Sequence, residues 1–174
     1  MEKTIADNLM IQRSLTRLTY EIIEKNKGIN NLILVGVKTR GEFLAKRIAE
    51  QMAKLEGNTV PVCAVDVSAY RDDRHDDDKR NQFADQITTQ IDDQHIVLVD
   101  DVFYTGRTMR AAMDALMDMG RPKRISIAVL VDRGHREMPI RPDFVGKNIP
   151  TANDEKVQVN LSEVDQQDQI NLIK

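Results

Sequence analysis

Two adjacent aspartates, Asp100 and Asp101, directly follow an unbroken apolar run at residues 96–99. An apolar run without alternation indicates a strand buried on both faces, as in a parallel sheet. A small-residue turn at 105–108 follows and leads into a segment with helical spacing of its apolar residues. Because a helix presents free N–H groups and its positive dipole end to the entering turn, this turn favours an anion, above all phosphate. Neighbouring carboxylates suit hydroxyls or a hydrated Mg²⁺, so we predict a site for a phosphorylated sugar or nucleotide.

A second turn repeats this design with the opposite charge. The apolar run 32–37 leads directly into Lys38, Thr39, Arg40 and Gly41, and a helical pattern follows. Two cations at the end of a buried strand suit a polyphosphate. An ordinary loop with surface cations produces the same pattern, so the residues alone leave both interpretations open.

Strands and helices in alternation must position these turns. The spacing of apolar residues in the rest of the sequence predicts these elements. We predict further strands at 60–67, 125–131, 157–161 and 170–173, and helices at 5–27, 43–55 and 109–117. Gly28 is the candidate C′ residue of the first helix. Three prolines with Gly146 mark residues 139–150 as irregular. The alternation predicts one α/β domain over residues 1–174, with a mostly parallel central sheet flanked by helices.

The composition is that of an ordinary globular domain with an aliphatic core, since aromatic residues make up 4% and tryptophan is absent. The net charge of −3 argues against a generally basic, nucleic-acid-coating protein but allows a local basic face. The single cysteine, Cys63, excludes an internal disulfide and stands in an apolar run, so we expect a buried thiol. No transmembrane or signal-peptide pattern occurs, and we expect a cytoplasmic protein without membrane association.

The polar stretch at residues 74–82 contains no apolar residue and interrupts the strand-helix pattern. A segment of this kind inside a compact domain is typical of a mobile lid or a disordered loop. His75 stands among aspartates here, and since no second histidine is near, a solvated loop is a better interpretation than a metal site.

On the first helix, Arg13 and Arg17 share one face. Their spacing favours a solvated surface, with an anion or nucleic-acid contact as the alternative.

Residues 96–108 resemble the phosphoribosyl-pyrophosphate (PRPP) signature of type I phosphoribosyltransferases. Other motifs are similar to those of one family of bacterial pyrimidine-operon attenuation regulators that are also uracil phosphoribosyltransferases. These motifs are 26–28 (Asn-Lys-Gly), 37–41 (Val-Lys-Thr-Arg-Gly), 70–73 (Tyr-Arg-Asp-Asp), 120–122 (Gly-Arg-Pro), 131–137 (Val-Asp-Arg-Gly-His-Arg-Glu) and 145–151 (Val-Gly-Lys-Asn-Ile-Pro-Thr). The resemblance covers nearly the whole chain. The PRPP signature alone identifies only the superfamily, whereas the joint set is highly specific.

The resemblance implies the type I phosphoribosyltransferase fold with a mobile lid at about residues 71–90 and a small hood at about residues 135–174. It also implies the reaction of uracil with PRPP to give UMP and pyrophosphate, with Mg²⁺ as cofactor. Displacement at the anomeric carbon through an oxocarbenium-like state needs positioning and stabilisation of the leaving pyrophosphate more than a nucleophile. The lid would exclude water, because hydrolysis of PRPP is the competing loss.

The resemblance assigns catalytic roles to Asp100, Asp101 and Arg40. The two aspartates would hold the ribose hydroxyls and help to place hydrated Mg²⁺ without bonding it directly. The turn at 105–108 would bind the 5′-phosphate, the turn at 38–41 the pyrophosphate, and residues 131–133 would face the base. The implied PRPP- and UMP-binding residues are Lys38, Thr39, Arg40, Gly41, Asp100, Asp101, Val102, Phe103, Tyr104, Thr105, Gly106, Arg107, Thr108, Val131 and Arg133.

Tyr104 departs from the pattern of the related purine enzymes, which place an acidic residue just before the Thr-Gly pair as a base toward the purine. A phenol is a poor base at neutral pH. We therefore assign no general base, and expect the pyrimidine to lose its proton to solvent or to a group that the sequence does not identify.

The family resemblance also bears on the basic residues, because its members bind a stem-loop of the leader mRNA through a basic face of a dimer when UMP or UTP is bound. Thr16, Arg17, His135, Arg136 and Arg141 match the positions implicated in that contact. A concave basic surface can bind a hairpin loop by its shape and splayed bases. The implied partners are therefore uracil, PRPP, UMP or UTP, leader mRNA, and further copies of the chain in a homodimer or higher homo-oligomer.

Three functions follow from these observations: an enzyme that is also an RNA-binding regulator, an RNA-binding nucleotide sensor with negligible catalysis, and a salvage enzyme alone. The intact acidic pair and the cationic turn at 38–41 weigh against the second. The matching basic residues weigh mildly against the third. We expect the first.

Overall fold

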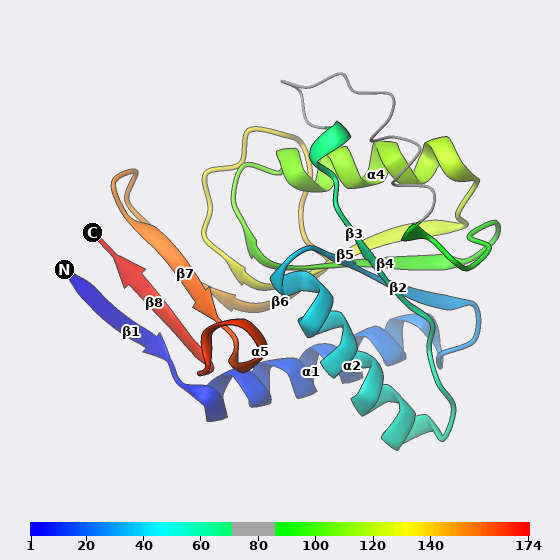
Figure 1. Cartoon of the computed structure of the whole chain (residues 1–174), viewed down its shortest axis with the longest axis horizontal. Helices are drawn as coiled ribbons and strands as arrows, with labels where there is room; N and C mark the ends of the chain where they lie inside the picture. Colours follow the sequence, from blue (N-terminus) through cyan, green and yellow to red (C-terminus); the bar gives the residue numbers. More distant parts are fainter. Residues whose placement is uncertain (71–85) are drawn as a thin grey trace.

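The computed structural model describes residues 1–70 and 86–174, and its centre is a sheet of five parallel strands in the order β3-β2-β4-β5-β6. Helices α1 and α2 cover one face of this sheet and α4 covers the other (Figure 1). The elements are β2 (Leu32–Val37), β3 (Val62–Val65), β4 (His95–Phe103), β5 (Arg124–Asp132), β6 (Phe144–Asn148), α1 (Asn8–Asn26), α2 (Arg40–Glu56), α4 (Arg107–Met119) and a 3₁₀ turn, η1 (Ser68–Tyr70). This layering confirms the predicted α/β fold with a parallel sheet flanked by helices.

Alternate residues of the central strands pack into two separate cores. Leu34 of β2 and Val97 of β4 pack with α1 and α2, whereas Val35 and Leu98 pack with α4 on the opposite face. Because both faces of the sheet are covered, no position of these strand segments needs to be polar. This is the physical reason for the unbroken apolar runs in the sequence. Cys63 is buried, as expected, and free.

A second, antiparallel sheet of three strands lies beside the first and joins both ends of the chain (Figure 1). It consists of β1 (Glu2–Ala6), β8 (Gln169–Ile173) and β7 (Lys156–Asn160), and the short helix α5 (Ser162–Asp165) connects β7 to β8. The predicted strands at 157–161 and 170–173 are thus confirmed. The segment from about residue 135 that we expected to form a hood is divided, since β6 belongs to the central sheet and β1 joins β7 and β8.

The first predicted helix is wrong at its start, because residues 5 and 6 lie in β1 and α1 begins only at Asn8. The side chain of Asp7 accepts a hydrogen bond from the N–H of Met10 at 2.9 Å, which caps the helix at that point. At the other end Lys27, with φ of 55°, is the left-handed residue that ends the helix, and Gly28 follows with φ of 115°. The N–H of Gly28 instead reaches the carbonyl of Ile23 at 2.9 Å, so this glycine stands one position beyond the predicted one.

The prediction of an irregular segment at 139–150 is also wrong, because it contains the edge strand β6. Gly146 allows this strand to pair closely with β5, since a Cβ there would lie 2.6 Å from the carbonyl oxygen of Leu130. The strand was missed because it is short and its flanking prolines resemble loop signals.

The third strand is shorter than predicted, ending at Val65, and β4 is longer, running through both aspartates to Phe103. Among the described residues, no helix is long and apolar enough to cross a membrane.

Candidate active site

A polar cavity of about 390 Å³ opens at the carboxyl ends of β2, β3 and β4. It is lined by Val37, Lys38, Thr39, Arg40, Asp66, Val67, Ser68, Asp100, Asp101, Val102 and Thr108. The two sequence-predicted turns thus meet at one cavity, although they are about sixty residues apart in the chain. In open α/β sheets, ligands bind at this edge.

Two glycines bring the cationic turn against the acidic one. A Cβ on Gly41 would lie 2.3 Å from the carbonyl oxygen of Val99, and a Cβ on Gly36 would lie 2.5 Å from the carbonyl oxygen of Gly41. The first turn of α2 therefore packs directly on β2 and β4, which only glycine permits. The N–H of Lys38 donates to the carbonyl of Val65 at 2.9 Å, and the Lys38–Thr39 peptide bond is cis. These contacts hold Lys38 and Arg40 at the cavity wall.

The acidic pair is half-buried, and its carboxylates are bound locally. The N–H of Asp101 donates to Oδ1 of Asp100 at 2.9 Å, and the N–H of Val102 donates to Oδ1 of Asp101 at 2.8 Å. Loss of solvation raises the pKa of Asp100 well above the ordinary range, and the neighbouring charge of Asp101 raises it further. A hydroxyl donor or a cation in the cavity would relieve this repulsion, so the pair suits a sugar or a hydrated metal ion.

The amino end of α4 offers an anion site on the same side. Gly106, with φ of 93°, precedes the helix as its N-cap residue and has no side chain that could cap the first turn. The nearest local contact, from the N–H of Arg107 to Oγ1 of Thr105, is 3.3 Å long. Thr108, in this first turn, lines the cavity. The free N–H groups and the helix dipole suit a phosphate.

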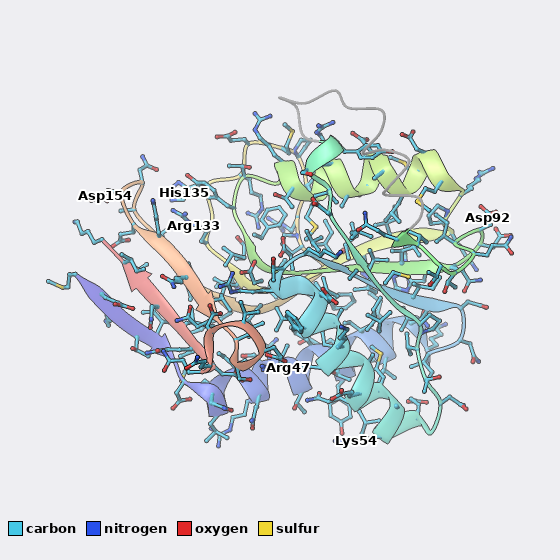
Figure 2. All side chains as sticks on the ribbon, viewed as in Figure 1. Arg47, Lys54, Asp92, Arg133, His135 and Asp154 are labelled. Atoms are coloured by element: carbon cyan, nitrogen blue, oxygen red, sulfur yellow. The ribbon has the colours of Figure 1, made fainter. Side chains whose placement is uncertain are left out.

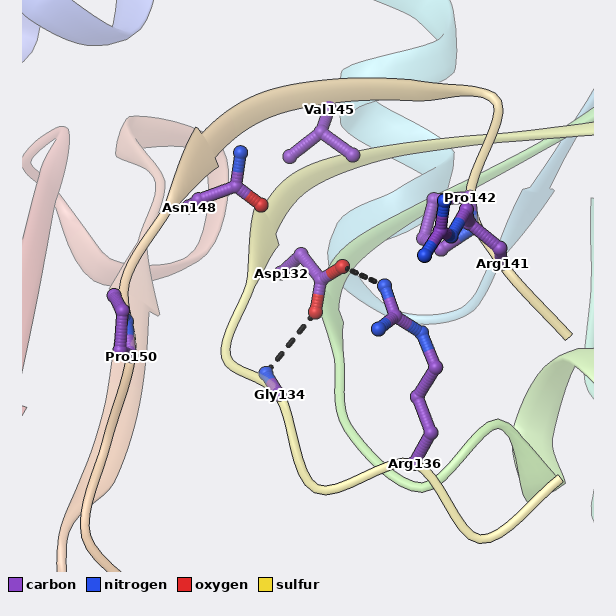
Figure 3. Close-up of a pocket in the computed structure, with 8 residues that line it drawn as sticks. All are labelled: Asp132, Gly134, Arg136, Arg141, Pro142, Val145, Asn148 and Pro150. Atoms are coloured by element: carbon purple, nitrogen blue, oxygen red, sulfur yellow. Dashed lines mark hydrogen bonds and ion pairs between the residues drawn. The ribbon is translucent and has the colours of Figure 1, made fainter. Parts of the chain in front are cut away.

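A second cavity, of about 420 Å³, lies at the carboxyl end of β5 beside β6 (Figure 3). Asp132 at its wall is buried, with 6% of its surface exposed. Its Oδ1 accepts a hydrogen bond from the N–H of Gly134 at 3.0 Å, and its Oδ2 accepts one from Arg136. The guanidinium of Arg136 also lies 5.6 Å from the ring centroid of Phe103. Arg141 lines the same cavity, which therefore brings together two of the basic residues expected to bind RNA.

Of the other residues expected to bind RNA, Arg17 and His135 have contacts of their own. Arg17 reaches from α1 to the edge strand β6, donating to the carbonyls of Val145, at 3.2 Å, and Gly146. Nε2 of His135 is 2.6 Å from the carbonyl oxygen of Thr151. Thr16 is exposed. Arg17 is exposed, as expected for a solvated surface, with 49% of its side chain accessible, and its guanidinium also attaches α1 to β6.

The residues expected to face the base are deeply placed. Val131 is fully buried and pairs in register with Val102, which lines the first cavity. Arg133 is 8% exposed, donates to the carbonyl of Glu155 at 2.6 Å, and lies 4.0 Å from the ring centroid of Tyr104 (Figure 2). Arg133 thus joins the end of β5 to the segment before β7.

Several predicted site residues do not line the first cavity, and a few lining residues were missed. Those outside it are Gly41, Phe103, Tyr104, Thr105, Gly106, Arg107, Val131 and Arg133. Asp66, Val67 and Ser68 were missed because the third strand was predicted to continue to residue 67. Since Val37 and Val65 are register partners at the ends of parallel strands, the residues after Val65 belong to the same edge as Lys38. The predicted lid at 71–90 lies mainly outside the described residues, as do most of the Tyr-Arg-Asp-Asp motif and His75.

Comparison with known proteins identifies the class of this fold and site. The chain matches the phosphoribosyl transferase domain over residues 1–167, and it belongs to this family. The chain is 59% identical to the bifunctional protein PyrR of Limosilactobacillus fermentum, over 99% of this chain and 98% of the relative. It is 60% identical to the bifunctional protein PyrR of Ligilactobacillus salivarius, over 100% of this chain and 99% of the relative.

Solved structures of purine phosphoribosyltransferases share the fold at low identity. The hypoxanthine phosphoribosyltransferase of Trypanosoma cruzi matches with a TM-score of 0.72 and 20% identity, over 99% of this chain and 96% of that one. The hypoxanthine-guanine enzyme of Leishmania tarentolae matches with a TM-score of 0.73 and 17% identity, over 99% and 97%. At such identities the likeness concerns the fold alone.

Proposed function

We propose that this protein transfers the phosphoribosyl group of PRPP to uracil, giving UMP and pyrophosphate, and that it also regulates pyrimidine operon expression by uridine-nucleotide-dependent binding of leader mRNA. Relatives at 54–60% identity over nearly their whole length carry the name bifunctional protein PyrR, which supports both roles. The observation that carries the enzymatic role is the single cavity that joins Lys38 and Arg40 to Asp100 and Asp101.

The residues of this cavity suit the two ends of PRPP. Lys38 and Arg40 bind the pyrophosphate, and their positive charges stabilise the negative charge that develops on it as the bond to the anomeric carbon breaks. Asp100 and Asp101 accept hydrogen bonds from the ribose hydroxyls and stabilise positive charge on the ring. The first turn of α4 binds the 5′-phosphate. Uracil, beside residues 131–133, then forms the new bond through N1 to the carbon that pyrophosphate leaves, and the N1 proton passes to solvent.

The donor set also suits Mg²⁺ held mainly by water and PRPP. Among the residues that the structure describes, no group of three or more acidic, histidine or cysteine side chains is placed to hold a metal ion. Mg²⁺ usually keeps several waters and binds through one or two carboxylates plus substrate phosphates, and Asp100 and Asp101 provide two carboxylates in the cavity. When bound, Mg²⁺ offsets the charge of the pyrophosphate and so improves it as a leaving group.

The regulatory role rests on the basic residues around the second cavity. Arg136 and Arg141 line it, and Arg17 reaches the neighbouring strand β6. Their charges contact the phosphates of an RNA hairpin, whose affinity therefore falls steeply with salt. We further propose that the chain forms a homodimer or higher homo-oligomer, and that it acts in the cytoplasm, where PRPP and leader transcripts are made.

The reaction is tested directly by incubating the protein with radiolabelled uracil, PRPP and Mg²⁺ and separating labelled UMP. We expect UMP formation that depends on all three components. Product no greater than that of an Asp101→Asn variant would exclude the enzymatic role. RNA retention on a filter with and without UMP tests the regulatory role: nucleotide-dependent retention of leader RNA but not of a scrambled hairpin supports it, and equal retention of both RNAs contradicts it.

A further inference from the structure

Arg40 is held by a carboxylate far away in the sequence. Its Nε and Nη2 donate to Oδ2 and Oδ1 of Asp165 at 3.1 and 2.8 Å. Asp165 ends the short helix α5, which connects two strands of the three-stranded sheet. Both side chains are largely buried, with 29% of Arg40 and 21% of Asp165 exposed. A paired, bidentate contact of this kind fixes the plane of the guanidinium.

The carboxylate of Asp165 is itself fixed. Its Oδ2 also accepts a hydrogen bond from the N–H of Leu161 at 2.9 Å, and Leu161 is fully buried in the core. The support therefore runs from a core backbone group through Asp165 to Arg40 at the cavity wall. A flexible arginine loses rotamer entropy when a ligand fixes it, and this cost is avoided if the side chain is already held.

The contact uses only one side of the guanidinium. Nη1 of Arg40 donates to none of the residues that the structure describes. The two N–H groups of Nη1 and the second N–H group of Nη2 are therefore available to a ligand. The negative charge of Asp101 also raises the pKa of Arg40, and both residues line the first cavity.

A second arginine of α2 shows what a purely structural clamp looks like. Arg47, two helical turns after Arg40, donates from Nε, Nη1 and Nη2 to Glu163 and Asp168 at 2.6 to 2.8 Å, and also reaches Ser162 (Figure 2). All three of its nitrogens are engaged. Arg47 therefore attaches α5 to α2, and Asp165 is not needed for that purpose.

We propose that Asp165 is a positioning residue for PRPP binding, which orients Arg40 so that the free end of its guanidinium faces the pyrophosphate. The inference rests on the proposed function, since it assumes that the cavity binds PRPP. Asp165 does not touch the substrate and acts only through Arg40. Its removal leaves Arg40 charged but no longer directed, so PRPP binding weakens while the uracil side of the site is unaffected.

The test is a double-mutant cycle on PRPP binding, measured by calorimetry in Mg²⁺ without uracil. We expect Asp165→Ala to raise the Kd for PRPP about tenfold, and Asp165→Asn, which keeps one acceptor, to raise it less. In an Arg40→Ala background, replacing Asp165 should change the Kd less than about twofold. In turnover assays the KM for PRPP should rise and the KM for uracil should not.

Asp168→Ala is the matched control, because Asp168 also forms a bidentate pair with an arginine of α2, through Nη1 and Nη2 of Arg47. This variant should lower Tm and leave the Kd for PRPP unchanged. The proposal is overturned if Asp165→Ala and Asp165→Asn leave the Kd unchanged, or if the loss is as large without Arg40. PRPP binding and UMP formation are separate readouts, so a failure of the uracil reaction leaves the result of the binding cycle intact.

Discussion

Asp100 on β4 and Asp132 on β5 are carboxylates near the ends of neighbouring parallel strands, and each stands at the wall of a cavity of similar size. They differ in their partners. Asp132 is neutralised by Arg136 and accepts a backbone N–H as well. Asp100 accepts one backbone N–H and stands beside a second carboxylate.

The difference shows that position at the sheet edge does not decide the chemistry of a carboxylate. Asp132 has an internal counter-ion, so it contributes to the fold and leaves its cavity basic. None of the described residues forms an ion pair with Asp100 or Asp101, so a ligand would have to supply their counter-ion. The four predictions below test this contrast.

The largest effect is expected at Asp101. Asp101→Asn removes a charge that the proposed reaction uses, and we expect kcat/KM for PRPP to fall about a hundredfold or more. Steady-state UMP formation measures this, with Asp118→Asn as control, because Asp118 is an exposed carboxylate on α4. Equal rates for wild type and Asp101→Asn would contradict the claim that the charge of Asp101 interacts with a bound ligand.

Replacing Arg141 tests whether the basic residues at the second cavity bind RNA. Arg141 is exposed, so Arg141→Ala should leave UMP formation near that of the wild type. Leader RNA affinity should fall about tenfold, and the slope of log affinity against log salt should become shallower by about one. Filter binding over a salt series measures both quantities. Arg121→Ala, an exposed arginine before β5, is the control, and an equal loss there would mean that the binding is not confined to this face.

Asp132 should be important for stability. Asp132→Asn leaves Arg136 without its counter-ion and should lower the free energy of unfolding by about 1–3 kcal/mol. Urea unfolding measures the loss. If the ion pair is the cause, adding Arg136→Met should restore part of the stability, whereas an unchanged loss in the double variant would assign it to packing.

The smallest effect is expected at Asp100, where substitution should raise the stability of the fold, whereas substitution of Asp132 should lower it. Because its pKa is raised, the folded chain binds this proton more tightly than the unfolded chain, so the group stabilises the fold at acid pH. That stability is lost as the pH rises from the ordinary carboxyl range through the raised pKa. Asp100→Asn removes the loss and should be more stable than the wild type at pH 8. A variant that is less stable than the wild type at pH 8 would contradict the assignment.

The sequence predicted the parts of the fold that depend on local pattern. Residues 32–37 and the acidic pair after residue 99 were recognised because a strand covered on both faces leaves an apolar run. Strand β1 was missed because its few apolar residues gain burial only from a distant partner, as Ala6 does opposite Ile170. The contact of Arg40 with Asp165 spans 125 residues, and no local pattern in the sequence indicates it.

The three-stranded sheet also sets an order of events during synthesis. Strand β1 is made before its partner β8, which comprises residues 169–173, so β1 stays unpaired until these residues have been synthesised. At about 5–20 residues per second, this delay is on the order of ten to thirty seconds. The helix that holds Arg40 lies just before β8. A nascent chain can therefore form the central strands early, whereas Asp165 can hold Arg40 only after α5 has been synthesised.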